Sequence, residues 1–141
     1  MRYILIVIFG ALLVLSCKEQ EDKVAEKPEL IMAETSEMAQ LMREMYAFNE
    51  SIRQQIIDGE LANAYPLSFD KIHSAVLTDP SDRDASFEQF SNHFIKAERA
   101  VFVNDSDDLI YKYNNAINAC ISCHNVTCTG PIPRIKKLLI N

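Results

Sequence analysis

Apolar residues recur along most of this chain at intervals of three and four positions, a spacing that puts them on one face of an α-helix. The longest such pattern runs from residue 28 to residue 58. Pro28 suits the first position of a helix, and Gly59 suits the position after its end. About thirty residues with a rise of about 1.5 Å each would form a rod of roughly 45 Å, and its single apolar face needs partner helices. That face is formed by positions 31, 35, 38, 42, 45, 49, 52 and 56.

Two shorter helical patterns follow. Residues 67–78 form the first, which ends before Pro80 because proline disfavours a helical conformation in the residue that precedes it. We expect Ser81 to be the N-cap of the next helix, with Asp84 at its third position as a variant of the capping box. The inward face of that helix carries Phe87, Phe90, Phe94, Ala97 and Val101.

A fourth helical pattern precedes a turn-rich loop. Asp107 and Asp108 occupy its first turn, where negative charge is favoured, and the helix runs to about His124. Residues 125–133 form the loop, and residues 134–140 add one or two closing helical turns. Because no segment shows sustained alternation of apolar and polar residues, the pattern predicts an all-α, up-and-down four-helix bundle with a short C-terminal extension.

The N-terminus has the features of an export signal. A single basic residue precedes an apolar run at residues 3–15, which is shorter than the roughly 18 to 20 residues of a membrane-spanning helix. The run ends at Cys17 in a pattern that resembles the bacterial lipobox, where a lipid is attached to the cysteine; an uncleaved anchor is the alternative. We therefore expect a signal peptide at 1–16, a lipidated cysteine and polar tether at 17–27, and a helical domain at 28–141. This organisation predicts a cell-envelope protein, lipid-anchored to a bacterial membrane and facing the periplasm or the cell surface.

The charge balance narrows the choice of partners. The formal net charge is −6, and removal of residues 1–16 lowers it further because they contain only one charged side chain, a basic one. Nucleic acid is therefore an unsuitable partner, since binding to phosphates needs a basic surface. A basic protein or a small molecule is a better electrostatic match.

The segment from Cys120 to His124 follows the C-x-x-C-H pattern of covalent haem attachment. Two thiols three residues apart on a helical turn can each form a thioether to a haem vinyl group, and the adjacent imidazole can then bind the iron as its proximal ligand. Cys120 and Cys123 are the predicted thioether residues. Because c-type haem is attached after export, the export signal supports one covalent haem c as the cofactor.

Other interpretations of these cysteines remain open. A thioredoxin-type C-x-x-C lies at a helix N-terminus after a strand, whereas this motif ends a helix. A zinc site could use both motif cysteines, His124 and Cys128, although four ligands within nine residues are close together for a tetrahedral site. Cys128 could also form a disulfide.

An up-and-down bundle with C-x-x-C-H near the end of its last helix resembles the class II cytochromes c, the cytochrome c-prime type. The likeness covers roughly residues 28–124, and its specific part is the haem motif. The resemblance implies that the sixth position of the iron is either open or filled by a methionine of the first helix.

Three methionines of the first predicted helix are candidates for that sixth ligand. The first and last helices of an up-and-down bundle are antiparallel, so His124 lies beside the N-terminal part of the first helix. At about 1.5 Å per residue, Met38, Met42 and Met45 lie roughly 15, 21 and 26 Å along the helix. This ranks Met38 first, although methionine at helical spacing is also typical of core packing.

Other side chains could complete the surroundings of a haem. His73 and His93 could reach the iron, but a histidine beside an apolar face is more often structural. Basic residues of the C-terminal tail could meet the haem propionates or simply be solvated. The candidate pocket walls are Phe90, Phe94 and Tyr113, and the candidate propionate partners are Arg134, Lys136 and Lys137.

These features predict a mono-haem c-type cytochrome that transfers single electrons to and from redox partner proteins. No acid–base pair for substrate turnover is apparent, so we expect a carrier and not an enzyme. One alternative is a five-coordinate haem protein that binds a small gas such as NO or CO. Another is a haemless lipoprotein that acts as a zinc site or an interaction module.

Overall fold

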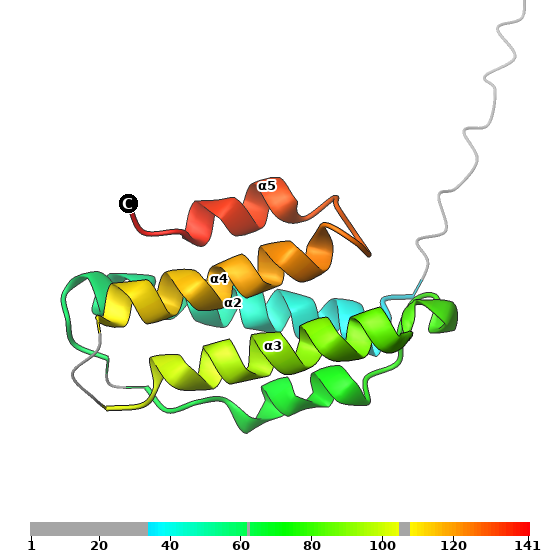
Figure 1. The fold of residues 1–141 in the computed structure, drawn as a ribbon, viewed down its shortest axis with the longest axis horizontal. Coiled ribbons are helices and arrows are strands. Elements are labelled where there is room, and N and C mark those ends of the chain that lie inside the picture. The colour runs from blue at the N-terminus through cyan, green and yellow to red at the C-terminus, as the bar shows by residue number, and fades with distance from the viewer. Residues whose placement is uncertain (1–33, 62, 105–107) are drawn as a thin grey trace, which may run out of the picture. The chain divides into compact units, whose positions relative to one another are not determined.

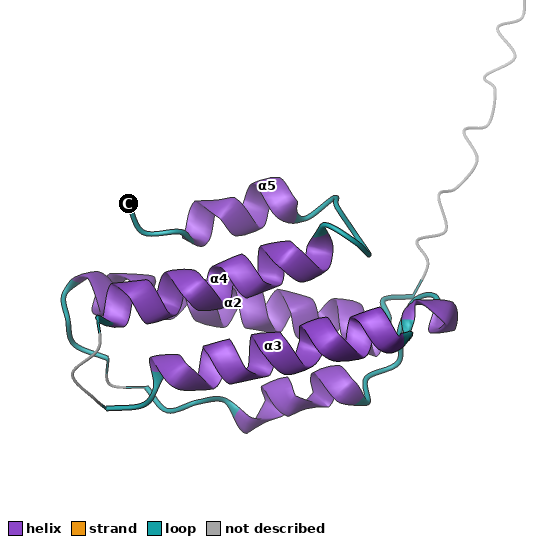
Figure 2. Cartoon of the chain, viewed as in Figure 1, coloured by secondary structure: helices purple, strands orange, loops and turns teal. Residues whose placement is uncertain are grey.

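The computed structural model describes residues 34–61, 63–104 and 108–141. The predicted signal peptide at 1–16, the lipidated Cys17 and the tether at 17–27 lie outside these residues. All regular structure in the described ranges is helical, which confirms the all-α class (Figures 1 and 2). None of these helices has the length and apolar character needed to cross a membrane. The elements are α2 (Glu37–Ile57), η1 (Leu67–His73), η2 (Pro80–Asp82), α3 (Ala85–Val101), α4 (Leu109–His124), α5 (Ile132–Ile135) and η3 (Lys136–Leu138).

Three long α-helices and one 3-10 helix make up the body of the domain. α4 packs on both α2 and α3, and η1 also packs on both α2 and α3 (Figure 1). η1 therefore lies where the sequence predicts a second α-helix. The short helix α5 runs back along α4. Among the residues that the structure describes, the prediction of four α-helices in a bundle is thus met by three, with a 3-10 helix in the fourth place.

α2 begins later than the sequence pattern suggests. Residues 34–36 are not helical, and the helix starts at Glu37 rather than near Pro28. The side chain of Ser36 caps it by accepting a hydrogen bond from the backbone N–H of Ala39, at 3.1 Å. With 21 residues the helix is roughly 32 Å long, so the predicted rod of roughly 45 Å is wrong.

The irregular segment after η1 holds the start of α2 in place. The backbone N–H of Met38 donates to the carbonyl oxygen of Val76 at 3.0 Å, and the N–H of Val76 donates to Glu37 Oε2 at 2.9 Å. The hydroxyl groups of Ser36 and Thr78 lie 2.9 Å apart. These bonds satisfy an unpaired N–H group of the first helical turn and fix the position of Met38.

The helix predicted at 67–78 is wrong beyond His73, where the 3-10 helix η1 ends. Val76 is 59% exposed instead of facing inward. The guanidinium group of Arg83 explains the early end, because it donates to three carbonyl oxygens that a continuing helix would use for its own hydrogen bonds. These acceptors are the backbone oxygens of Ile72 at 3.4 Å, His73 at 2.8 Å and Ala75 at 2.6 Å.

Asp84, and not Ser81, is the N-cap of α3. Asp84 Oδ1 accepts from the backbone N–H of Phe87 at 2.7 Å. Ser81 belongs to η2, where its own N–H donates to Asp79 Oδ1 at 2.9 Å. Asp79 caps η2 and Asp84 caps α3, so the prediction of a capping box that starts at Ser81 is wrong.

α4 matches its prediction closely. Asp108 is its N-cap and accepts from the backbone N–H groups of Ile110 and Tyr111, at 2.8 and 3.3 Å. The helix ends at His124, as predicted, while Asp107 lies outside the described residues. The fully buried side chains on its inner face are Tyr113, Ala116 and Ile117.

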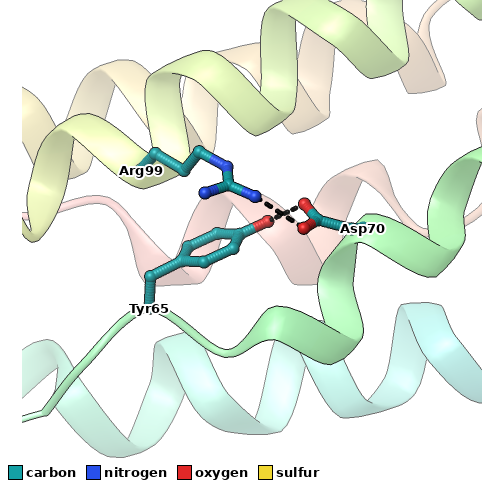
Figure 3. A network of polar contacts seen from close by, with 3 residues as sticks. All are labelled: Tyr65, Asp70 and Arg99. Carbon is teal, nitrogen blue, oxygen red and sulfur yellow. Dashed lines mark hydrogen bonds and ion pairs between the residues drawn. The ribbon is translucent and has the colours of Figure 1, made fainter.

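A polar network fastens η1 to α3 at the side of the domain (Figure 3). The hydroxyl group of Tyr65 donates to Asp70 Oδ1 at 2.7 Å, and Arg99 Nη2 lies 2.5 Å from Asp70 Oδ2. The Arg99 guanidinium also lies over the Tyr65 ring, 4.3 Å from its centroid. The hydrogen bond from Tyr65 and the nearby guanidinium lower the pKa of Asp70.

We predict that Tyr65→Phe lowers the free energy of unfolding by about 1 kcal/mol, because it removes one hydrogen bond and keeps the ring contacts. Urea unfolding followed by circular dichroism measures this change. Tyr111→Phe is the matched control, since the Tyr111 side chain is exposed. An equal effect of the two substitutions would show that the Tyr65 hydroxyl does not stabilise the domain.

Candidate functional site

A cavity of about 390 Å³ lies between α2, α4 and the C-terminal segment. Its volume lies in the range of pockets that hold small molecules and cofactors. Most of its wall is apolar. The residues that carry chemistry there include Met38, Met42, Arg43, Met45, Asn49, Asp82, Cys120, Cys123, His124, Cys128 and Arg134.

The three residues of the predicted haem motif lie together at one wall of this cavity. Cys120 and Cys123 belong to the last two turns of α4, and His124 is the final residue of the helix. The inner face of α4 is buried against α2 and α3, which orients the last turn of the helix toward the cavity. Both cysteine side chains are partly buried free thiols.

The imidazole of His124 is held in one tautomer. Its Nδ1 lies 2.8 Å from the backbone carbonyl oxygen of Cys128. Because a carbonyl oxygen can only accept, Nδ1 carries the proton and donates it to this bond. In the neutral imidazole Nε2 then has a free lone pair, which is the form that binds a metal, and a second hydrogen bond of this kind orients metal-binding histidines in general.

All three candidate methionines line the same cavity. Met38, Met42 and Met45 follow one another on α2 at spacings of four and three, and they lie on the cavity side of the helix. Because α2 starts at Glu37, the distances counted from Pro28 do not apply, but Met38 is still the methionine nearest the N-terminal end of the helix. Met38 and Met45 are buried, while Met42 is partly exposed.

Burial raises the pKa values of both motif thiols above that of an ordinary cysteine, and the effect on Cys120 is the larger. The negative charge of Glu98 raises the pKa of Cys120 further. Both thiols also lie at the C-terminal end of a helix, where the helix dipole disfavours a thiolate. A dithiol that works by thiol–disulfide exchange needs the opposite shift, so this environment does not favour a thioredoxin-type site.

Cys128 is exposed and lies in the loop after α4. The three described cysteines form no disulfide with one another. Within residues 34–61, 63–104 and 108–141, no three side chains of His, Cys, Asp or Glu converge as ligands of a metal ion. The contribution of Cys128 to the site comes from its backbone oxygen, which binds His124.

Several predicted contacts do not reach the cavity. His93 is exposed on α3, and His73 on η1 lies 3.4 Å from the hydroxyl of Ser91. Phe87 lines the cavity in place of Phe90 and Phe94. Other predicted residues that do not line it are Tyr113, Lys136 and Lys137.

The C-terminal segment forms a wall of the cavity that the sequence pattern does not reveal. Ile135 and Leu138 are buried, and the guanidinium of Arg134 lies 3.9 Å from the centroid of the Tyr46 ring. Arg53 on α2 donates to the carbonyl oxygens of Leu138 and its neighbour, at 3.1 and 3.2 Å. The signal for this role is the recurrence of apolar residues after the loop, which is too short to show a helical period.

We predict that iodoacetamide alkylates Cys128 at least about tenfold faster than Cys120 in the folded, haem-free chain. The reason is that Cys128 is exposed, whereas Cys120 is partly buried and its raised pKa depletes its thiolate form. Timed labelling followed by peptide mass spectrometry measures both rates, and labelling in denaturant is the control in which the rates converge. Equal rates in the folded chain would contradict the partial burial and the raised pKa of Cys120.

Comparisons with protein-family models, with curated proteins and with solved structures find no match to this chain. Inferences about function therefore rest on the chemistry of the residues around the cavity.

Proposed function

We propose that this protein is a mono-haem c-type cytochrome of the cell envelope that carries single electrons between partner proteins. The observation that carries this proposal is the convergence of Cys120, Cys123 and His124 on one cavity, with three methionines of α2 on its wall. The two cysteines have the spacing needed for two thioether bonds, and the histidine follows them directly.

Each residue of the motif has a separate role in this proposal. Cys120 and Cys123 hold the haem covalently, and His124 binds its iron through Nε2. The hydrogen bond from Nδ1 to the oxygen of Cys128 keeps the imidazole oriented and makes it a stronger electron donor. When bound, the haem supplies a one-electron ferric–ferrous couple whose potential depends on the axial ligands and on the polarity of the pocket.

The rest of the cavity suits a large apolar group with two acidic substituents. Its wall is mainly apolar and would exclude water from the haem edge. Arg43 on α2 and Arg134 on α5 also line it, and their guanidinium groups can form paired hydrogen bonds with the propionates. We further propose that the domain is a variant of the class II cytochrome c bundle, in which the 3-10 helix η1 takes the place of the second α-helix.

The location follows from the N-terminal sequence. Residues 1–16 direct export, and a lipid on Cys17 anchors the chain to a membrane through the tether at 17–27. This environment is the one in which c-type haem is attached. The net charge of −6 favours redox partners with a basic docking surface.

We predict that the wild-type chain, expressed with a c-type maturation system, carries a haem that stays attached after denaturation. The double substitution of Cys120 and Cys123 by Ala abolishes this attachment, because no thiol remains to form a thioether. Absorption spectra of the denatured protein and intact mass spectrometry measure the bound haem. Cys128→Ala is the matched control and keeps the haem; a colourless wild-type chain would disprove the proposed function.

We predict that one of three single substitutions, Met38→Leu, Met42→Leu or Met45→Leu, removes a methionine–iron charge-transfer band and leaves a high-spin haem. Leucine keeps the size of the side chain, so the other two variants retain the wild-type spectrum and act as controls. Near-infrared absorption of the ferric protein measures the band. If the wild type is already high-spin and its ferrous form binds CO, the sixth position is open and the protein binds a gas instead.

A further inference from the structure

A buried carboxyl group lies in the core next to the cavity. Glu98 on α3 is 0% exposed, and its Oε1 accepts a hydrogen bond from Asn49 Nδ2 on α2 at 3.1 Å. The same Nδ2 donates to the backbone oxygen of Met45, also at 3.1 Å. Because both partners are acceptors, the orientation of the Asn49 amide is fixed. The hydroxyl of Tyr113 donates to the backbone oxygen of Asn49 at 3.0 Å and completes the cluster.

Two acceptor atoms in this cluster have no partner. They are Oε2 of Glu98 and Oδ1 of Asn49, each fully shielded from solvent. An ionised carboxylate supplies no donor, so it leaves both atoms unsatisfied. A proton on Glu98 Oε2 supplies the missing donor. The protonated carboxyl group can then donate to the Asn49 amide oxygen, which meets the general need of buried polar groups for a hydrogen-bond partner. Burial raises the pKa of Glu98 to about 7, while the hydrogen bond from Asn49 opposes this shift.

The charge of Glu98 acts on residues that line the cavity. Asn49 lines the cavity, and the carboxylate raises the pKa of Cys120, one of the proposed haem attachment residues. Glu98 also raises the pKa values of Tyr113 on α4 and of Tyr65 in the segment before η1. These neighbours are neutral, and no cation among the described residues contributes to the pKa of Glu98.

We propose that Glu98 binds a proton when the haem held by Cys120, Cys123 and His124 is reduced, so that the protein carries a proton with its electron. The inference rests on the proposed function. In the balanced step, a haem held there would gain one electron from a reduced partner protein, and Glu98 would gain one proton from solvent, which forms an O–H bond on its carboxylate. The O–H bond that breaks is that of the hydronium ion or water molecule that gives up the proton, and oxidation reverses both transfers.

Electrostatic linkage gives the direction of this coupling. Reduction removes one positive charge from the cavity, which makes a nearby buried carboxylate less stable and its protonated form more stable. The linkage is reciprocal, so the ionised carboxylate in turn stabilises the ferric state. The midpoint potential therefore falls as pH rises through the range in which Glu98 titrates.

We predict that the midpoint potential of the haem-containing chain falls with rising pH, by up to about 59 mV per pH unit for one proton per electron. The range to be covered extends over roughly two pH units on either side of the Glu98 pKa. Glu98→Gln removes the slope, because glutamine supplies the same donor to Asn49 and cannot titrate. Spectroelectrochemical titration measures the potentials, and Glu88→Gln, an exposed substitution on the same helix, keeps the wild-type slope.

The outcomes separate this inference from the proposed function. A colourless wild-type chain disproves the haem itself. A haem protein whose potential does not change with pH, or whose slope survives Glu98→Gln, disproves the proton coupling alone.

An infrared measurement on the wild type covers the case in which Glu98→Gln does not fold. The reduced-minus-oxidised difference spectrum gains a protonated carboxyl band near the Glu98 pKa, and this band shifts in D₂O and on carboxyl-¹³C labelling of glutamate. Absence of such a band disproves proton uptake by a buried glutamate.

Discussion

The burial of the inner face of α4 against α2 and α3 is the interaction on which the rest of this domain depends. Tyr113, Ala116 and Ile117 are fully enclosed, and together they fix both the axis and the rotation of the helix. Since a helix turns once in about 3.6 residues, this rotation also decides where the next turn faces. Cys120 is three residues beyond Ile117 on the same face, so the packing that stabilises the fold is also what brings the two thiols and His124 to the cavity.

The same core contains a conflict between stability and chemistry. An apolar side chain at the position of Glu98 would remove the buried carboxyl group with its unsatisfied Oε2, and buried polar groups of this kind rarely add to stability. The chain instead accepts the desolvation of a carboxyl group, moderated by one hydrogen bond from Asn49. A retained group of this kind within the electrostatic reach of Cys120 makes physical sense if its protonation equilibrium is used.

The sequence predicted an element well where only one residue could start or end the helix, and poorly where several residues could. α4 has one apolar face, so its end at His124 could be predicted from the sequence, while Asp108, expected in the first turn, is its N-cap. The start of α2 could not be predicted from the sequence, because Pro28 suits a first helical position and Ser36 suits an N-cap. The choice of Ser36 depends on its bonds to the segment at 76–78. The end of η1 depends on the guanidinium of Arg83, and the local pattern of apolar residues cannot predict that contact. The three methionines share one helical face, so spacing cannot tell a ligand from a core residue.

The order of the walls along the chain has a consequence for assembly. The thiols and the imidazole belong to residues 120–124, whereas the wall formed by Ile135 and Leu138 comes last in the sequence. Until that segment folds back and Arg53 binds its carbonyl oxygens, one side of the cavity stays open. A bulky planar group can enter most easily during this interval. For the proposed haem, the C-terminal segment would then close the cavity after the group has entered, and the order of these folding steps would bear on its capture.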